Sequence, residues 1–401
     1  MRNRSVGLTL FGALAVIVAA CGGGATPSPA ASATPAASMT AEPSGSAEPS
    51  ESPSASAEVP QADLKIGLVT DVGTLDDKNF NEYSWLGTQD AAAAIGSDPP
   101  RSAVSQVSAD IATNIQGFVD QDFDVIVTVG FAAGADTIAA AKANPEINFI
   151  GIDQSPCVDA EGNNDPTFTC AGDAATLLPN LQGIQWKEQQ PGYLAGIVAA
   201  SISESGVIGA VGGTAAVPAV PNYIIGYENG AKSINPDIQV VVAYVSAAPD
   251  AAAFADPAGG QAFASQMLSQ TPDIDVMFQV AGLTGNGVLQ AACDADIHAI
   301  GVDVDQFIST PATAECTVVS AEKKLRKNVF DAIVRIAGGT AEGGTIKLDI
   351  TTDDVGLSPF HDFEDLITPE IQAALDEAVA GMKDGTLLAC EENAFGGCVT
   401  G

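Results

Sequence analysis

Short apolar runs recur along the chain from about residue 62 onward, and segments with a helical pattern, such as residues 132–143 and 193–202, separate them. The runs are rich in β-branched residues and apolar nearly throughout, which is typical of parallel strands whose sheet carries helices on both faces. Right-handed crossovers between such strands predict a doubly wound α/β sheet. The predicted strands span residues 64–72, 125–130, 147–153, 207–212, 240–245, 276–281 and 299–304.

The predicted strands fall into two groups, which the segment around residues 157–170 interrupts. This grouping predicts two lobes of ordinary domain size, joined by a hinge. We expect residues 62–183 with 320–345 to form the first lobe, and residues 186–318 with 346–401 to form the second. Ligands of open parallel sheets bind beyond the carboxyl ends of the strands, so we expect a binding site in the cleft between the lobes.

The N-terminal 61 residues have a different composition. Arg2 and Arg4 precede an apolar run, residues 6–20, that is too short to cross a bilayer comfortably and ends at Cys21. This order is typical of a bacterial lipoprotein signal peptide, so we expect Cys21 to be lipidated at the extracytoplasmic face of the cell membrane; ordinary secretion with an incidental cysteine is the alternative. Residues 22–61 are nearly all small or polar, which predicts a disordered tether.

The net charge is −35 and the pI is near 4.1, which argues against nucleic-acid binding and against an anionic bulk ligand. Beyond Cys21, six cysteines fall in three close pairs, which suits disulfides outside the cytoplasm, although sequence alone leaves their connectivity open. Zinc is disfavoured because there is no CxxC and there are only two histidines, so we expect no metal or cofactor. The pairs are Cys157/Cys170, Cys293/Cys316 and Cys390/Cys398.

The densest polar motif follows the first predicted strand. Residues 67–82 read Gly-Leu-Val-Thr-Asp-Val-Gly-Thr-Leu-Asp-Asp-Lys-Asn-Phe-Asn-Glu, and residues 192–196 read Gly-Tyr-Leu-Ala-Gly. With Ala-Gly-Leu-Thr-Gly at 281–285 and Gly-Val-Asp-Val-Asp-Gln at 301–306, these motifs resemble the basic membrane protein family. Its members are substrate-binding lipoproteins of ABC importers and include the purine nucleoside receptor lipoproteins.

The resemblance implies the type I periplasmic-binding-protein fold, in which two lobes close on a ligand by a hinge motion and the closed form docks on a membrane permease. It also implies a monomer without enzymatic activity. In nucleoside-binding members, two aromatic rings stack on the base while amide and acidic side chains hold its edge and the ribose. Carried over, this places Phe80 and Tyr223 on the two faces of the base, Asn79 and Asp153 on its edge, and Asp71, Gly282, Asp303 and Lys323 among the remaining contacts.

Some of these residues have alternative roles. We expect Asp76 or Asp77 to cap the helix that begins near Phe80. Asp71 follows a buried strand and needs a partner, which is either the ligand or backbone amides. Phe80 packs in the core if it does not contact the ligand.

The chain also departs from the family pattern. Tyr223 stands where the family usually has Phe, and Gln190 stands where it has an acidic residue, which puts a carboxylate contact at that point in doubt. Lys324 competes with Lys323 for the match to the family lysine. The glycine-rich residues 282–287 lack the spacing of a phosphate-binding loop.

The residues therefore favour capture of a nucleoside, with a purine preferred. A sugar or another small heterocycle is the alternative ligand, and a ligand sensor built on the same clamp is the alternative role. An extracytoplasmic nucleoside hydrolase is disfavoured, because there is no Gly-x-Ser-x-Gly motif and no catalytic Cys/His pattern.

Overall fold

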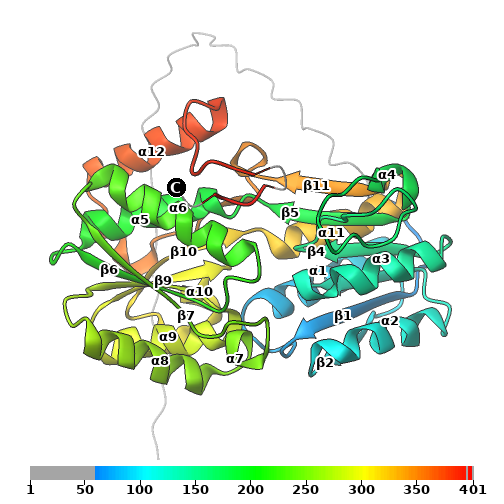
Figure 1. The fold of residues 1–401 in the computed structure, drawn as a ribbon, viewed down its shortest axis with the longest axis horizontal. Coiled ribbons are helices and arrows are strands. Elements are labelled where there is room, and N and C mark those ends of the chain that lie inside the picture. The colour runs from blue at the N-terminus through cyan, green and yellow to red at the C-terminus, as the bar shows by residue number, and fades with distance from the viewer. Residues whose placement is uncertain (1–58, 394–395, 400–401) are drawn as a thin grey trace, which may run out of the picture. The chain divides into compact units, whose positions relative to one another are not determined.

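The computed structural model describes residues 59–393 and 396–399. The predicted signal peptide, Cys21 and most of the predicted tether lie outside these residues. The described chain forms two six-stranded sheets, each covered by helices (Figure 1). This confirms the predicted α/β class with two lobes. Within the described residues, no helix combines the length and the apolar character that crossing a bilayer requires.

The first sheet is parallel throughout, with strand order β11-β5-β4-β3-β1-β2. Ile66 and Leu68 lie in an apolar cluster with residues of α1 and α11. Val69, on the opposite face of the sheet, packs with residues of α2 and α3. Burial on both faces explains why this strand is apolar throughout. The elements are β1 (Ile66–Val72), β2 (Arg101–Ser105), β3 (Val125–Val129), β4 (Asn148–Ile152), β5 (Leu181–Trp186), β11 (Gly344–Leu348), α1 (Phe80–Ile95), α2 (Ile111–Val119), α3 (Gly134–Ala143), α4 (Ala174–Leu177) and α11 (Leu325–Ala337).

The second sheet has the order β12-β10-β9-β8-β6-β7, and only β12 runs antiparallel to its neighbour. The helices α5 and α6 cover one face, and α8 and α9 cover the other. The elements are β6 (Val207–Gly212), β7 (Gln239–Tyr244), β8 (Val276–Val280), β9 (His298–Asp303), β10 (Thr317–Lys323), β12 (Val355–Leu357), α5 (Gln189–Ile202), α6 (Ala219–Ile234), α7 (Ala251–Phe254), α8 (Pro257–Gln270), α9 (Gly282–Asp294), α10 (Gln306–Ser309) and α12 (Pro369–Asp384).

The glycines of the Gly-Tyr-Leu-Ala-Gly motif serve packing between α5 and α6. A Cβ on Gly192 would lie 2.2 Å from the carbonyl oxygen of Tyr223, and a Cβ on Gly226 would lie 2.1 Å from that of Gln189. Only glycine permits backbones to approach this closely. The motif therefore fixes the position of α6, and with it the position of Tyr223.

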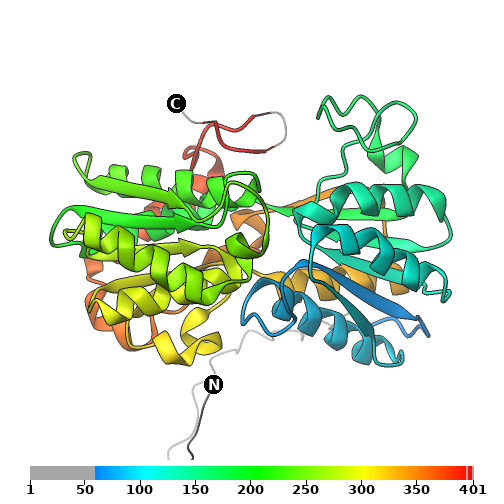
Figure 2. The ribbon, with the colours of Figure 1, turned by 60° about the horizontal axis from the view of Figure 1, so that its bottom comes forward.

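The chain crosses between the lobes after β5, after β10 and after β11 (Figure 2). These crossings lie later in the chain than three of the expected lobe limits. β5 stays in the first sheet up to Trp186, past the expected limit at 183. β10 stays in the second sheet up to Lys323, past the expected limit at 320, and β11 stays in the first sheet up to Leu348, past the limit at 345. The reason is that a chain leaves a sheet only where its strand ends, and the sequence analysis predicted none of these strands.

Each of the three cysteine pairs forms a disulfide. Cys157–Cys170 closes part of the long loop between β4 and β5, and Cys293–Cys316 joins α9 to the segment before β10. Cys390–Cys398 closes a loop near the C-terminus. The structure thus joins the three close pairs and supplies the connectivity that the sequence left open.

Candidate functional site

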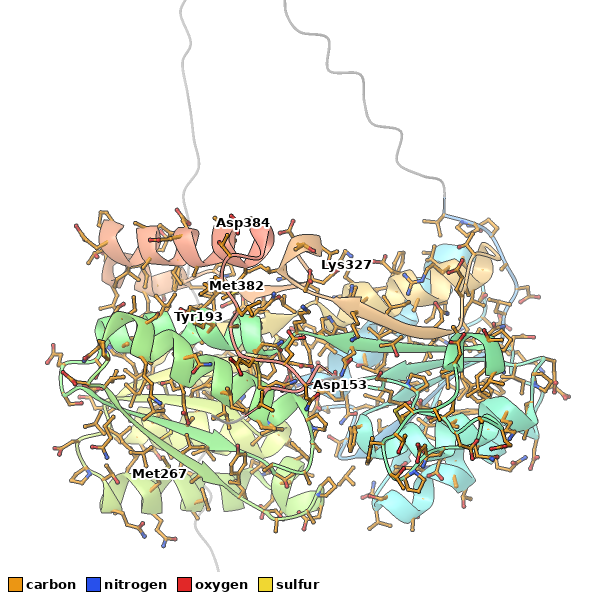
Figure 3. All side chains as sticks on the ribbon, turned by 45° about the horizontal axis from the view of Figure 1, so that its top comes forward. Asp153, Tyr193, Met267, Lys327, Met382 and Asp384 are labelled. Atoms are coloured by element: carbon orange, nitrogen blue, oxygen red, sulfur yellow. A yellow bond between two sulfur atoms is a disulfide. The ribbon has the colours of Figure 1, made fainter. Side chains whose placement is uncertain are left out.

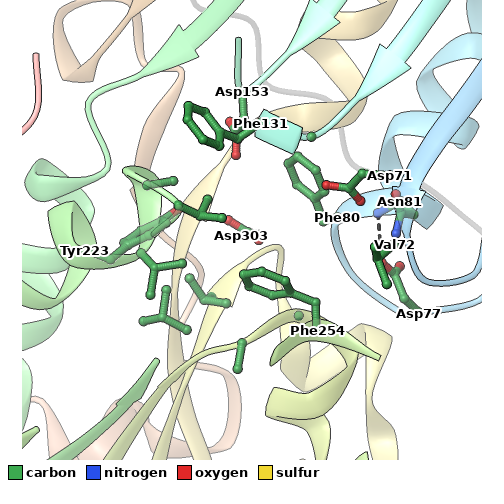
Figure 4. A pocket seen from close by; sticks show the side chains of 18 of the residues that line it. Asp71, Val72, Asp77, Phe80, Asn81, Phe131, Asp153, Tyr223, Phe254 and Asp303 are labelled. Carbon is green, nitrogen blue, oxygen red and sulfur yellow. Dashed lines mark hydrogen bonds between the residues drawn. The ribbon is translucent and has the colours of Figure 1, made fainter. Parts of the chain in front are cut away.

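A cavity lies where the carboxyl ends of the two sheets face each other (Figure 4). The side chains that line it come from both lobes and from the crossing strand β10. Every residue predicted to contact a ligand lines this cavity except Asn79. These residues are Asp71, Phe80, Asp153, Tyr223, Gly282, Asp303 and Lys323.

Helix α1 positions Phe80 through a cap that Asp77 provides. One carboxylate oxygen of Asp77 accepts hydrogen bonds from the backbone N–H groups of Asn79 and Glu82, and the other accepts from that of Asn81. The predicted capping role is thus confirmed for Asp77. Phe80 and Asn81 line the cavity, as Figure 4 shows.

Asn79 is oriented differently from the expectation. Its side chain is fully buried and does not line the cavity, and both atoms of its amide lack a hydrogen-bond partner among the described residues. The cap turns the backbone so that the next residues face the cleft instead. A contact between Asn79 and a ligand stays a prediction.

Four aromatic rings line the cavity. Phe80 and Phe131 come from the first lobe, and Tyr223 and Phe254 come from the second (Figure 4). Tyr223 is 1 % exposed, packs edge-on against Phe278 and donates a hydrogen bond to Asp303 over 3.2 Å. The hydroxyl that distinguishes Tyr223 from the usual Phe therefore binds a protein carboxylate.

Sequence reasoning missed Phe131 and Phe254. Phe131 follows β3 by two residues, so the rule that picked out Asp71 and Asp153 at strand ends would have found it. Phe254 ends the short helix α7 inside a connection, where no pattern in the sequence marks it.

Lys323 lies at the centre of a buried group of charges. Its Nζ atom is 2.6 Å from Asp153, 3.5 Å from Asp303 and 3.9 Å from Glu188, and it lies 4.8 Å from the centre of the Phe80 ring. The three carboxylates raise the pKa of Lys323 against the effect of burial, so its ammonium group stays charged. Lys324, the competing candidate, points outward and pairs with Glu322.

Two carboxyl groups resist ionisation: that of Asp71, which lines the cavity, and that of Glu188, which pairs with Lys323. Burial, followed by repulsion from Asp153 and Asp77, raises the pKa of Asp71 to about 8. Burial also raises the pKa of Glu188 to about 7, with Lys323 opposing the shift and Asp153 adding to it. Near neutral pH these groups therefore offer both hydrogen-bond donors and acceptors to a ligand.

Gln190 stands where the family pattern has an acidic residue, and the nearest acidic residue, Glu188, pairs with Lys323 without lining this cavity. Gln190 accepts a hydrogen bond from the backbone N–H of Ile350 and does not reach the cavity. Glu188, two residues earlier, lies at the crossing after β5 and accepts a hydrogen bond from Asn222. Sequence reasoning missed Glu188, because β5 itself was not predicted as a strand.

Gly282 begins α9 beside the cavity with a φ of 52°, a left-handed conformation that favours glycine. Further along α9, the side chain of Asn286 donates a hydrogen bond to the backbone carbonyl of Asp77 and so joins the second lobe to the first. No set of three or more His, Cys, Asp or Glu suited to a metal ion occurs in the described part of the chain.

Comparison with known proteins decides the family. Residues 65–382 match the model of the family described as ABC transporter substrate-binding protein PnrA-like. The chain belongs to this family. It includes the basic membrane proteins, and its members bind a small solute for an ABC transporter outside the cytoplasm without catalysing a reaction.

Members with curated names are similar over most of their length. The CD4+ T-cell-stimulating antigen of Listeria monocytogenes is 29% identical over 343 residues, which cover 81% of this chain and 87% of that one. The ABC transporter nucleoside-binding protein BmpA of Lactococcus lactis is 28% identical over 347 residues, covering 82% and 89%.

The solved structures give the fold of this family member. A solute-binding protein of an ABC transporter system from Aeropyrum pernix has a TM-score of 0.68 at 23% identity, covering 81% of this chain and 92% of that one. A carbohydrate transporter solute-binding protein from Agrobacterium radiobacter has a TM-score of 0.53 at 16% identity, covering 78% and 99%. The fold is thus the two-lobed periplasmic-binding-protein fold that the sequence predicted.

Proposed function

We propose that this substrate-binding protein captures a nucleoside, with a purine preferred, and delivers it to an ABC permease. The observation that carries the proposal is the combination of aromatic rings with buried carboxyl groups and one ammonium group around a single cavity. Rings stack on the flat faces of a base, and carboxyl groups exchange hydrogen bonds with base edges and ribose hydroxyls. The name of the Lactococcus relative supports the same ligand class.

Phe80 is the primary stacking surface in this proposal. The ammonium group of Lys323 lies over its ring, so a base stacks on the part of the ring that Lys323 leaves open. Tyr223 stands on the opposite lobe, where its hydrogen bond to Asp303 fixes the ring. Asp71 lies against Gly130, where any Cβ would collide with its carboxyl group, and faces the cavity from the first lobe.

A thermal-shift panel tests the ligand class. A ligand at 100 times its dissociation constant adds about 2.7 kcal/mol of stability. With an unfolding entropy of about 2.1 cal/mol/K per residue, this raises the melting temperature by about 4 °C. We expect adenosine, guanosine or inosine to produce this shift. If a free pentose raises the melting temperature and no nucleoside does, the ligand is a sugar and the proposal is wrong.

The proposal includes a lipid anchor at Cys21. The order of charged, apolar and small residues before this cysteine supports it. We expect the Cys21→Ser variant to leave the membrane fraction of expressing bacteria and to lose incorporation of labelled fatty acid. Retention of both properties in the variant would refute the anchor.

A further inference from the structure

A second cavity adjoins the first at the lobe junction. The two share Phe131, Asp153, Val217 and Ala219 in their linings. The first cavity measures about 70 Å³ and the second about 340 Å³. Pockets for small ligands typically measure roughly 300–1,000 Å³. The first cavity alone is smaller than this range, so we expect a bound ligand to extend into the second.

Two disulfide-closed loops wall the second cavity. Cys157 and Cys170 line one side together with Phe168, and Gly397, inside the Cys390–Cys398 loop, lines another. Figure 2 shows the loop between β4 and β5 and the C-terminal segment on the same side of the crossing strands.

Both loops are held in place by further contacts. Lys142 donates hydrogen bonds of 2.6 Å to the backbone of Glu161 and to Asn163, within the first loop. In the second loop, the backbone N–H of Cys398 donates to the side chain of Asn222 over 2.8 Å. The walls are therefore preorganised, which lowers the entropy cost of binding a ligand between them.

An unpartnered acceptor lies at the junction of the two cavities. Asp153 is 10% exposed, and its Oδ2 atom binds Lys323, while its Oδ1 atom is buried without a hydrogen-bond partner among the described residues. Figure 3 shows Asp153 where the two lobes meet, and Figure 4 shows its carboxyl group directed into the site. A buried acceptor of this kind is costly unless a ligand supplies a donor.

The charges around this acceptor favour a cationic donor. Glu188, which lines the second cavity, is 3% exposed at its side chain, and its ion-pair partner Lys323 is shared with Asp153 and Asp303. Three carboxylates thus share one ammonium group. Apart from Lys323, no Lys or Arg of the described residues lines either cavity. A second cation would favour the ionised form of Glu188, whose pKa burial raises to about 7, and would pair with it, whereas a phosphate would be repelled by the carboxylates.

We propose that the second cavity binds a primary ammonium group carried on an extension of the ligand, with Glu188 and Asp153 as its acceptors. The inference rests on the proposed function and refines it: the preferred solute is a nucleoside whose sugar bears an amino group. Phe168, which is 52% exposed at this cavity, supplies an apolar rim beside the extension.

Calorimetric titration of the full chain with related nucleosides tests the inference. The probes are adenosine, 5′-amino-5′-deoxyadenosine, 3′-amino-3′-deoxyadenosine and adenosine 5′-monophosphate. We expect one of the two amino derivatives to bind at least about ten-fold more tightly than adenosine, because it gains a buried charge pair, and the monophosphate to bind more weakly. Equal binding of adenosine and both amino derivatives would overturn the inference and leave the nucleoside assignment intact.

Two variants locate the effect. Glu188→Gln removes one acceptor charge, and Ser155→Lys places a cation at an exposed position of the second cavity. Ser155→Lys also removes the hydrogen bond between Ser155 and Thr345, so its melting curve is compared with that of the parent protein. Each variant should reduce the ratio of amino-nucleoside to adenosine affinity by at least about five-fold. The matched control is Ser269→Lys, an exposed position on α8 that lines neither cavity, and it should leave the ratio unchanged.

The remaining outcomes separate this inference from the proposed function. Glucosamine and glucose are titrated as a further pair: if glucosamine binds, glucose does not and no nucleoside binds, the nucleoside assignment is wrong and the ammonium site stands. If the amino-nucleoside preference persists in both Glu188→Gln and Ser155→Lys, the second cavity does not read the ammonium group and the inference is wrong.

Discussion

Replacing Lys323 by methionine removes the ammonium group that three buried carboxylates share. Lys323 is 2% exposed at its side chain and lies within 3.9 Å of oxygens of Asp153, Asp303 and Glu188. Removing one partner of a buried ion pair typically costs about 3–5 kcal/mol, because the remaining charge is left uncompensated. We therefore expect Lys323→Met to lose about 3–5 kcal/mol of unfolding free energy at pH 7.5, a large share of the roughly 5–15 kcal/mol typical of a domain.

The loss should depend on pH in a defined direction. Burial raises the pKa of Glu188 and of Asp303, and Lys323 opposes both shifts, so removing Lys323 should raise these two folded-state pKa values further above their unfolded values. A carboxyl group with a raised folded-state pKa costs stability as pH increases through the range between the two values. The variant should therefore be less impaired at pH 5 than at pH 7.5.

Urea denaturation followed by circular dichroism at both pH values measures the effect. The matched control is Lys324→Met, whose lysine is 42% exposed at its side chain and pairs with Glu322 at the surface. Exposed pairs contribute about 0–1 kcal/mol, so this control should change little. A loss below about 1 kcal/mol in Lys323→Met, or a loss that does not vary with pH, would refute the reasoning.

Three further perturbations test separate parts of the structure. Phe80→Ala should weaken binding of adenosine by about ten-fold or more in calorimetry, and an unchanged affinity would assign Phe80 to packing. Burial raises the pKa of Asp71 from 3.8 to about 8, so the protonated side chain stabilises the fold at low pH, and this contribution is lost as pH rises through about 8. The melting temperature of Asp71→Asn should therefore vary less between pH 5 and 9 than that of the parent protein. Gly226→Ala places a Cβ 2.1 Å from the carbonyl oxygen of Gln189, so it should cost about 1–3 kcal/mol or more in urea denaturation, and a neutral result would contradict the close packing of α5 and α6.

Most of the strands that sequence predicted correctly are buried on both faces, where composition alone marks them; the exception is the edge strand β7, which its run of β-branched residues marks although none of its residues is buried. The strands it missed carry polar residues for identifiable reasons. β2 is an edge strand that begins with the exposed residues Arg101 and Ser102. β10 ends in Glu322 and Lys323, and both side chains are buried next to charged partners. Lys323 pairs with Asp153 of the first lobe, and Glu322 pairs with Lys324.

The site was predictable where it follows a predicted strand. Asp71, Asp153 and Asp303 stand at the ends of apolar runs, and the structure brings all three to one cavity. Glu188 was missed because it follows β5, whose alternating Leu-Gln-Gly-Ile-Gln-Trp sequence does not resemble a doubly buried strand. Its partnership with Lys323 joins residues 135 positions apart in the chain, which only the tertiary fold reveals.

Direct titration of a nucleoside into the protein tests the central claim. Trp186 is buried at the end of β5, 5.3 Å from the Nζ atom of Lys323, and Trp85 is the chain's other tryptophan. In a Trp85→Phe variant, fluorescence therefore reports on Trp186 beside the site. We predict a saturable fluorescence change with adenosine and none with free ribose. A saturable response to ribose, with no response to adenosine, guanosine, inosine or uridine, would contradict the account.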